Sequence, residues 1–139
     1  MDNMASEKSY RFASNTENIR IVENLVEDLV AEFSISEEFY GNILIALTEA
    51  VNNAIVHGNK LDPSKEVTLN CRADKNKLIF TIEDEGPGFD YDNLPDPTAP
   101  ENIEKPNGRG VFLMRNLADD CEFQDDGKIV QLEFDALTV

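Results

Sequence analysis

The stretch ALTEAVNNAIVHGN, residues 46–59, carries the features that decide the fold. This stretch is the C-terminal part of a segment in which apolar residues recur every three or four positions. That spacing predicts a helix over residues 37–57. Glu49 and Asn53 lie four residues apart and share a row well away from the centre of the apolar face. Because apolar residues flank that row too, we expect both side chains to face a pocket rather than open water.

Glu49 and Asn53 are also residue types that can do chemistry in a pocket. A carboxylate held there can serve as a general base, and an amide oxygen can ligate a hard cation. For an isolated pair at this spacing, an exposed surface stripe is the simpler explanation. The apolar flanks and the motifs that follow along the chain favour the pocket.

On the N-terminal side, the sequence predicts a flexible tail over residues 1–8 and a strand over 9–13. A helix over 14–33 follows, because Ser14 and Glu17 have the spacing of a capping box and one apolar stripe runs behind them.

On the C-terminal side, the period changes to strict alternation. Alternation predicts a hairpin over residues 67–83 and a closing hairpin over 121–134, with a short helix over 110–118. The intervening loop, 86–109, holds prolines and glycines without apolar periodicity. Two helices followed by strands predict an α+β fold: a two-layer sandwich in which helices pack on one face of a mixed β-sheet.

The sequence Asp84-Glu85-Gly86-Pro87-Gly88 follows the second strand of the first hairpin. An acid at a strand end, followed by two glycines, puts a hydrogen-bond acceptor beside backbone that a ligand can approach closely. An ordinary acidic turn is the alternative explanation. A calcium loop is not favoured, since the nearby aspartates lack EF-hand spacing.

The sequence Asn107-Gly108-Arg109-Gly110 comes directly before the predicted third helix. Glycines that open a helix expose amide donors and the positive end of the helix dipole, which suits a phosphate. Lys105 and Arg109 are rare positive charges in this acidic chain. A helix cap is the alternative, and the spacing fits neither a Walker A loop nor a dinucleotide fingerprint.

Composition limits the class of protein. The chain has 139 residues, which predicts a single domain over 1–139. Its 28 acidic and 12 basic side chains give a net charge of -16. That charge argues against a nucleic-acid or anionic membrane partner. No apolar run approaches a membrane span, and Cys71 and Cys121 lack the spacing of a zinc site or a disulfide scaffold. We therefore expect a reduced, cytoplasmic protein.

Together these motifs resemble the N, G1 and G2 boxes of the ATPase superfamily that includes gyrase, Hsp90, histidine kinases and MutL. Within it, EAVNNAIVHGN and GRGVFLM look most like the anti-sigma-factor serine/threonine kinases of bacterial partner-switching systems. The resemblance covers roughly residues 10–135 and implies a Bergerat-type ATP-binding fold.

The resemblance also implies roles for the first two motifs. Glu49 would be the general base toward a serine or threonine hydroxyl of a substrate protein. Asn53 would ligate a Mg²⁺ ion that bridges the ATP phosphates. Asp84 would receive the adenine amino group, and Gly86 and Gly88 would allow close approach.

For the third motif, the resemblance implies that Gly108 and Gly110 place backbone amides on the phosphates. Lys105 and Arg109 would add positive charge there, and residues 89–107 would form an ATP lid. One departure concerns the last hairpin, where many relatives carry threonine after its glycine. Here Gly127 is followed by Lys128 and Ile129, so a secondary contact near adenine is not carried over.

The function expected from the resemblance is that of an ATP-dependent protein serine/threonine kinase. It would phosphorylate an anti-sigma-factor antagonist protein and bind a sigma factor or equivalent client, and it could self-associate as a homodimer. The alternative is a non-catalytic, nucleotide-dependent protein-binding regulatory module. A third reading is an acidic scaffold without a nucleotide site.

Overall fold

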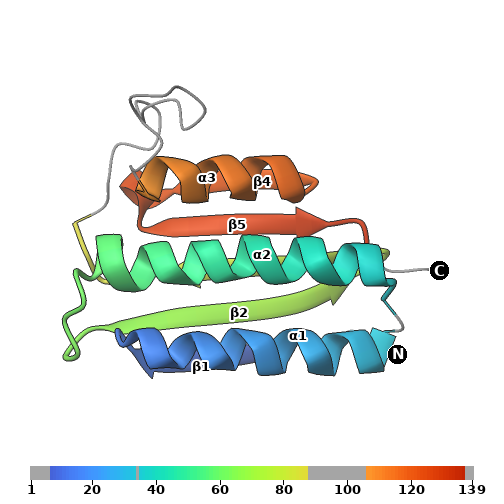
Figure 1. Cartoon of the computed structure of the whole chain (residues 1–139), viewed down its shortest axis with the longest axis horizontal. Helices are drawn as coiled ribbons and strands as arrows, with labels where there is room; N and C mark the ends of the chain where they lie inside the picture. Colours follow the sequence, from blue (N-terminus) through green and yellow to red (C-terminus); the bar gives the residue numbers. More distant parts are fainter. Residues whose placement is uncertain (1–6, 34, 88–105, 137–139) are drawn as a thin grey trace.

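The computed structural model describes residues 7–33, 35–87 and 106–136, with only the backbone described for 106–109 (Figure 1). In chain order the elements are β1 (Glu7–Ala13), η2 (Thr16–Asn18), α1 (Ile19–Phe33), α2 (Glu37–Asn53), η3 (Ala54–Gly58), β2 (Glu66–Asp74), β3 (Lys77–Glu83), α3 (Pro106–Leu117), β4 (Asp120–Gln124), η5 (Asp125–Gly127) and β5 (Ile129–Phe134). The strands form one sheet in the order β1-β2-β3-β5-β4.

The three α-helices lie on the same side of the sheet and run along its strands (Figure 1). The expected α+β architecture, with helices on one face, is therefore confirmed. The alternation of apolar residues along the strands explains why the helices pack on one face. Every second residue of β2, β3 and β5 is buried toward the helices and joins one continuous core. The largest fully buried side chains of that core are Phe80, Phe134, Leu25, Leu29, Ile43, Leu47, Ile55, Leu69, Leu78, Ile82, Met114 and Leu132.

The expectation of a mixed sheet is wrong, because all neighbouring strand pairs in the described residues are antiparallel. The helical crossover from β3 through α3 to β4 makes β3 and β4 parallel to one another. They do not pair, since β5 returns by a tight hairpin and takes the position between them. The strand–helix–strand pattern in the sequence does not by itself indicate that β5 inserts between β3 and β4.

The N-terminal boundaries differ from the expectation in two respects. β1 begins at Glu7, so the predicted tail is too long by two residues. The first helical turn is capped by Asn15, whose side chain accepts a hydrogen bond from the Glu17 amide at 2.9 Å. Ser14, the expected cap, is buried and donates instead to the Lys65 carbonyl oxygen at 2.7 Å.

The helix predicted over 37–57 is present, but its end is not regular. α2 has Ser36 as its N-cap and passes directly into the π-helical turn η3. The turn closes with a hydrogen bond from the Asn59 amide to the Ala54 carbonyl oxygen at 2.8 Å. π-helical turns are often found at functional sites, and this one sets the position of the residues that follow.

The third helix starts earlier than expected. α3 begins at Pro106, a residue type favoured at the first helical position, so Gly108 and Gly110 lie inside the helix rather than before it. The predicted tail, apart from Glu7 and Lys8, and the predicted lid, apart from its last two residues, lie outside the described residues. Within the described ranges, no helix has the length and apolar character needed to cross a membrane.

Candidate functional site

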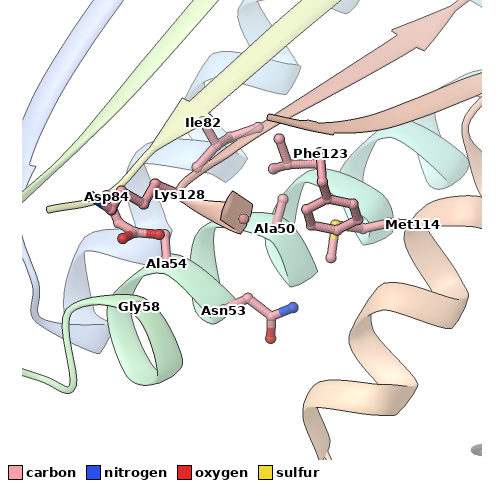
Figure 2. A pocket seen from close by; sticks show the side chains of 11 residues that line it. Ala50, Asn53, Ala54, Gly58, Ile82, Asp84, Met114, Phe123 and Lys128 are labelled. Carbon is pink, nitrogen blue, oxygen red and sulfur yellow. The ribbon is translucent and has the colours of Figure 1, made fainter. Parts of the chain in front are cut away.

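A pocket opens between the C-terminal half of α2, α3 and the ends of β3, β4 and β5. Its volume is about 300 Å³, including its open mouth. Only about 20 Å³ of this space can hold the centre of a water molecule, so most of it belongs to the open mouth. It is lined by Ala50, Asn53, Ala54, Gly58, Ile82, Asp84, Met114, Phe123, Gly127, Lys128 and Val130 (Figure 2).

Polar groups stand at separate places around this mostly apolar lining. Asp84 and Lys128 come from the ends of neighbouring strands, whereas Asn53 lies on α2 with its amide pointing toward α3, away from Asp84 (Figure 2). Ala50 and Ala54 lie one helical turn apart and both face the pocket. Their short side chains leave the space that larger residues would fill.

Asp84 is the buried carboxylate of this pocket, with 8% of its surface exposed. Its Oδ1 accepts a hydrogen bond from the Gly86 amide at 2.8 Å. Burial raises the pKa of the Asp84 carboxyl above its ordinary value, while the Gly86 amide and the positive charge of Lys128 oppose that shift. Because a carboxylate has several acceptor positions, it can still accept a hydrogen bond from a ligand.

Two glycines make room for Asp84. A Cβ atom on Gly58 would lie 2.4 Å from Asp84 Oδ2, and one on Gly86 would lie 1.8 Å from the Gly58 carbonyl oxygen. Neither glycine has a positive φ. They are therefore required by close packing between η3 and the segment after β3, not by a left-handed backbone.

Asn59 holds that segment in place through a buried hydrogen-bond network. Its Nδ2 donates to Ser14 Oγ at 2.8 Å and to the Glu66 carbonyl oxygen at 3.1 Å. Its Oδ1 accepts from the Glu85 amide at 2.7 Å. One side chain thus ties the ends of β1, η3 and β3 to the start of β2.

The second polar region lies between α2 and α3. Asn53 is 8% exposed, and its Nδ2 is buried without a hydrogen-bond partner among the described residues. A Cβ atom on Gly110 would lie 3.0 Å from Glu49 Oε1 and 3.3 Å from the amide atoms of Asn53. Glu49 and Asn53 thus lie on one helix row, as expected, and both lie against Gly110 of α3, but only Asn53 is among the residues that line the pocket.

For the other predicted site residues, the structure describes the backbone alone or nothing. Gly88 and Lys105 lie outside the described residues, and for Gly108 and Arg109 only the helical backbone is described. Gly108 falls in the first turn of α3, where amides have no partner within the helix. Gly110 falls in the next turn, so its close packing against α2 is the feature that the structure adds.

Several residues of the site were not recognised from the sequence. Gly58 was assigned only as a helix stop and Asn59 only as part of a turn, although a buried asparagine after a helix end is a usable signal. Phe123 carries no motif and Met114 ends the stretch GRGVFLM without an assigned role, since core side chains and pocket walls have the same pattern. Among the described residues no cluster of three or more metal-ligating side chains occurs.

Comparison with known proteins identifies the family to which the chain belongs. Residues 12–134 match the family described as histidine kinase-like ATPase domain. The anti-sigma F factor of Oceanobacillus iheyensis is 30% identical over 122 residues, which cover 86% of this chain and 83% of that protein. The anti-sigma F factor of Clostridium perfringens is 29% identical over 123 residues, covering 86% of each.

A serine-protein kinase RsbW of Bacillus cereus is 33% identical over 88 residues, which cover 59% of this chain and 54% of that protein. The chain belongs to the histidine kinase-like ATPases, a class defined by an ATP-binding domain of this architecture. Within that class, it is a member of the anti-sigma-factor kinase family.

Proposed function

We propose that this protein transfers the γ-phosphoryl group of ATP to a serine or threonine hydroxyl of an antagonist protein, and that it binds a sigma factor or an equivalent client. The observations that support the proposal, in a member of this family, are that Asn53 and Asp84 line one pocket and that Glu49 and Asn53 both lie against Gly110 of α3. The proposal locates the protein in the cytoplasm, where ATP and sigma factors are.

The apolar part of the pocket supports binding of adenine. Its lining is largely apolar, and Asp84 offers an acceptor for the exocyclic amino group. The carboxylate is held by the Gly86 amide before any ligand arrives, so little ordering is needed on binding.

The region beside α3 supports binding of the phosphates. Asn53 fits a magnesium ion, because its neutral Oδ1 lies beside Gly110 in α3, the helix whose first-turn amides are proposed to hold the phosphates. Asn53 Oδ1 would be the protein ligand, and Mg²⁺ would neutralise charge on the phosphate oxygens. Amides of the first turn of α3, including that of Gly108, would donate to the phosphates. In a chain with a net charge of -16, such local donors are needed.

Glu49 is the proposed general base. Its Oε1 lies against the start of α3, one helical turn from Asn53. In the proposed step the substrate hydroxyl oxygen bonds to the γ-phosphorus while the bond from that phosphorus to the β,γ-bridging oxygen breaks, leaving ADP. Glu49 takes the hydroxyl proton. Positioning and charge neutralisation supply most of the catalysis in such a transfer.

The test is transfer of label from γ-labelled ATP to a candidate antagonist protein from the same organism, in the presence of Mg²⁺. Wild type is expected to label the antagonist, and Glu49→Gln to bind ATP with unchanged affinity but to label about 10²–10⁴ times more slowly. ATP binding without any transfer by wild type would refute the kinase and favour the nucleotide-dependent binding module. No ATP binding at all would refute the nucleotide site itself.

The client is tested separately. The names of the two anti-sigma F factors support a sigma factor as the bound protein. We expect a sigma factor from the same organism to co-elute with this protein in ATP and to be released when excess antagonist is added. Co-elution that antagonist does not alter would contradict partner switching.

A further inference from the structure

Lys128 stands opposite Asp84 in the sheet. The Asp84 amide donates a hydrogen bond to the Lys128 carbonyl oxygen at 3.0 Å, which continues the β3–β5 register beyond the pair Glu83 and Ile129. Directly opposed residues of an antiparallel pair point to the same face. Lys128 is the C-cap of η5 and has helical backbone angles, but it lines the pocket together with Ile82 and Asp84 (Figure 2).

The two side chains offer complementary hydrogen-bonding groups. An ionised Asp84 only accepts, and the Lys128 ammonium only donates. No ion pair within 4.0 Å engages Lys128 among the described residues, so its donors are available to a ligand. The rest of the lining at this end is apolar or backbone, and Asn53 lies away toward α3 (Figure 2).

Adenine presents the matching pattern on its edge. The exocyclic amino group is a donor, and a ring nitrogen acceptor lies on each side of the carbon that carries it. A base whose amino group donates to Asp84 therefore brings a ring nitrogen close to the cross-strand neighbour of Asp84. A donor at residue 128 can satisfy that nitrogen, which would otherwise lose its hydrogen bond to water in the pocket.

We propose that Lys128 is a specificity-determining residue that donates a hydrogen bond to a ring nitrogen of adenine, beside the amino group that Asp84 accepts. The inference rests on the proposed binding of ATP in this pocket. It gives a role to the position after Gly127, where this chain has a lysine.

The experiment measures affinities by calorimetry for ATP, 1-deaza-ATP and 7-deaza-ATP, in which one ring nitrogen or the other is replaced by CH. Lys128→Met keeps the aliphatic stem and removes the donors. Lys65→Met is the matched control, because the charge of Lys65 also acts on Asp84 but Lys65 does not line the pocket.

For wild type, we expect one of the two analogues to bind about tenfold more weakly than ATP, the effect of one charge-assisted hydrogen bond. Lys128→Met should bind ATP and that analogue equally, and Lys65→Met should discriminate as wild type does. Equal discrimination by wild type and Lys128→Met would overturn the inference, as would a loss of discrimination in Lys65→Met or a wild type that binds all three equally. ATP binding by wild type tests the proposed function independently of these comparisons.

Discussion

Gly58 and Asp84 lie so close together that one added methyl group should weaken both ATP binding and the stability of the fold. Gly58→Ala is the perturbation. The new Cβ would lie 2.4 Å from Asp84 Oδ2 and 2.5 Å from Cγ, so the carboxyl group must move by about 1 Å to reach ordinary contact at 3.4 Å. The backbone of Gly58 has no positive φ, so alanine adds no backbone strain there.

The size of the stability loss follows from the hydrogen bond that the Asp84 side chain must break. Its backbone is fixed by the bond to Lys128, so the side chain has to rotate away from the Gly86 amide. Loss of that charged hydrogen bond costs about 1.5–3 kcal/mol, and overpacking costs about 1–3 kcal/mol. Alanine in a helical turn returns about 1 kcal/mol. We expect a net loss of about 1.5–5 kcal/mol and a melting temperature lower by about 5–20 °C.

The assay pairs thermal unfolding with calorimetric titration of ATP. With the Asp84 carboxyl displaced, affinity should fall by about 10- to 100-fold, the effect of one hydrogen bond to a charged group. Gly41→Ala is the control, because a Cβ at Gly41 on α2 meets nothing within 4 Å. It should stabilise the protein by about 0.5–1 kcal/mol and leave affinity unchanged.

A second variant isolates the collision. In an Asp84→Ala background the carboxyl is absent, so adding Gly58→Ala should cost little or even stabilise, while ATP binding stays weak. If Gly58→Ala costs as much stability in that background as in wild type, the steric argument is refuted. Unchanged ATP affinity in the single variant would refute the role assigned to Asp84.

Three further predictions concern single side chains. Asn59→Ala removes three side-chain hydrogen bonds at a buried position and should lower the free energy of unfolding by about 2–4 kcal/mol in urea denaturation. Asn53→Ala should weaken ATP binding about tenfold in Mg²⁺ but little in EDTA, as measured by calorimetry. Asp84→Asn should become more stable relative to wild type as pH rises from about 3 to about 7, because the raised pKa makes the stability contributed by Asp84 greatest when it is protonated.

Each of these has a contrary outcome. Asn24, exposed on α1, is the control for Asn59, and an equal cost at both sites would contradict the network. If Asn53→Ala lowers ATP affinity equally with and without Mg²⁺, Asn53 is not a metal ligand. A stability difference for Asp84→Asn that falls with rising pH would mean that Lys128 and the Gly86 amide outweigh the effect of burial.

Local periodicity was sufficient to predict most of the fold. The helix over 37–57 and both hairpins follow from spacing along the chain, and the pairing of Glu49 with Asn53 follows from helix geometry alone. The start of α3 carried a local signal as well, since Pro106 is favoured at a first helical position, but the glycines after it were given more weight.

The parts that could not be predicted depend on contacts between distant segments. The insertion of β5 between β3 and β4 leaves no trace in the sequence of either strand. The need for glycine at 58 arises from Asp84, 26 positions later, and the role of Asn59 depends on the ends of three other elements. The roles of Glu49, Asn53 and Asp84 toward ATP stay predictions until the experiments above are done.

The position of β5 has a consequence for biosynthesis. β5 is made after every other strand that the structure describes, yet it lies between two of them. A nascent chain that has emerged only as far as β4 has an open strand edge on β3 and no partner for β4, and Lys128 has not yet joined Asp84. Such a chain can form α1, α2 and the first three strands, but its pocket lacks a wall until the final hairpin closes.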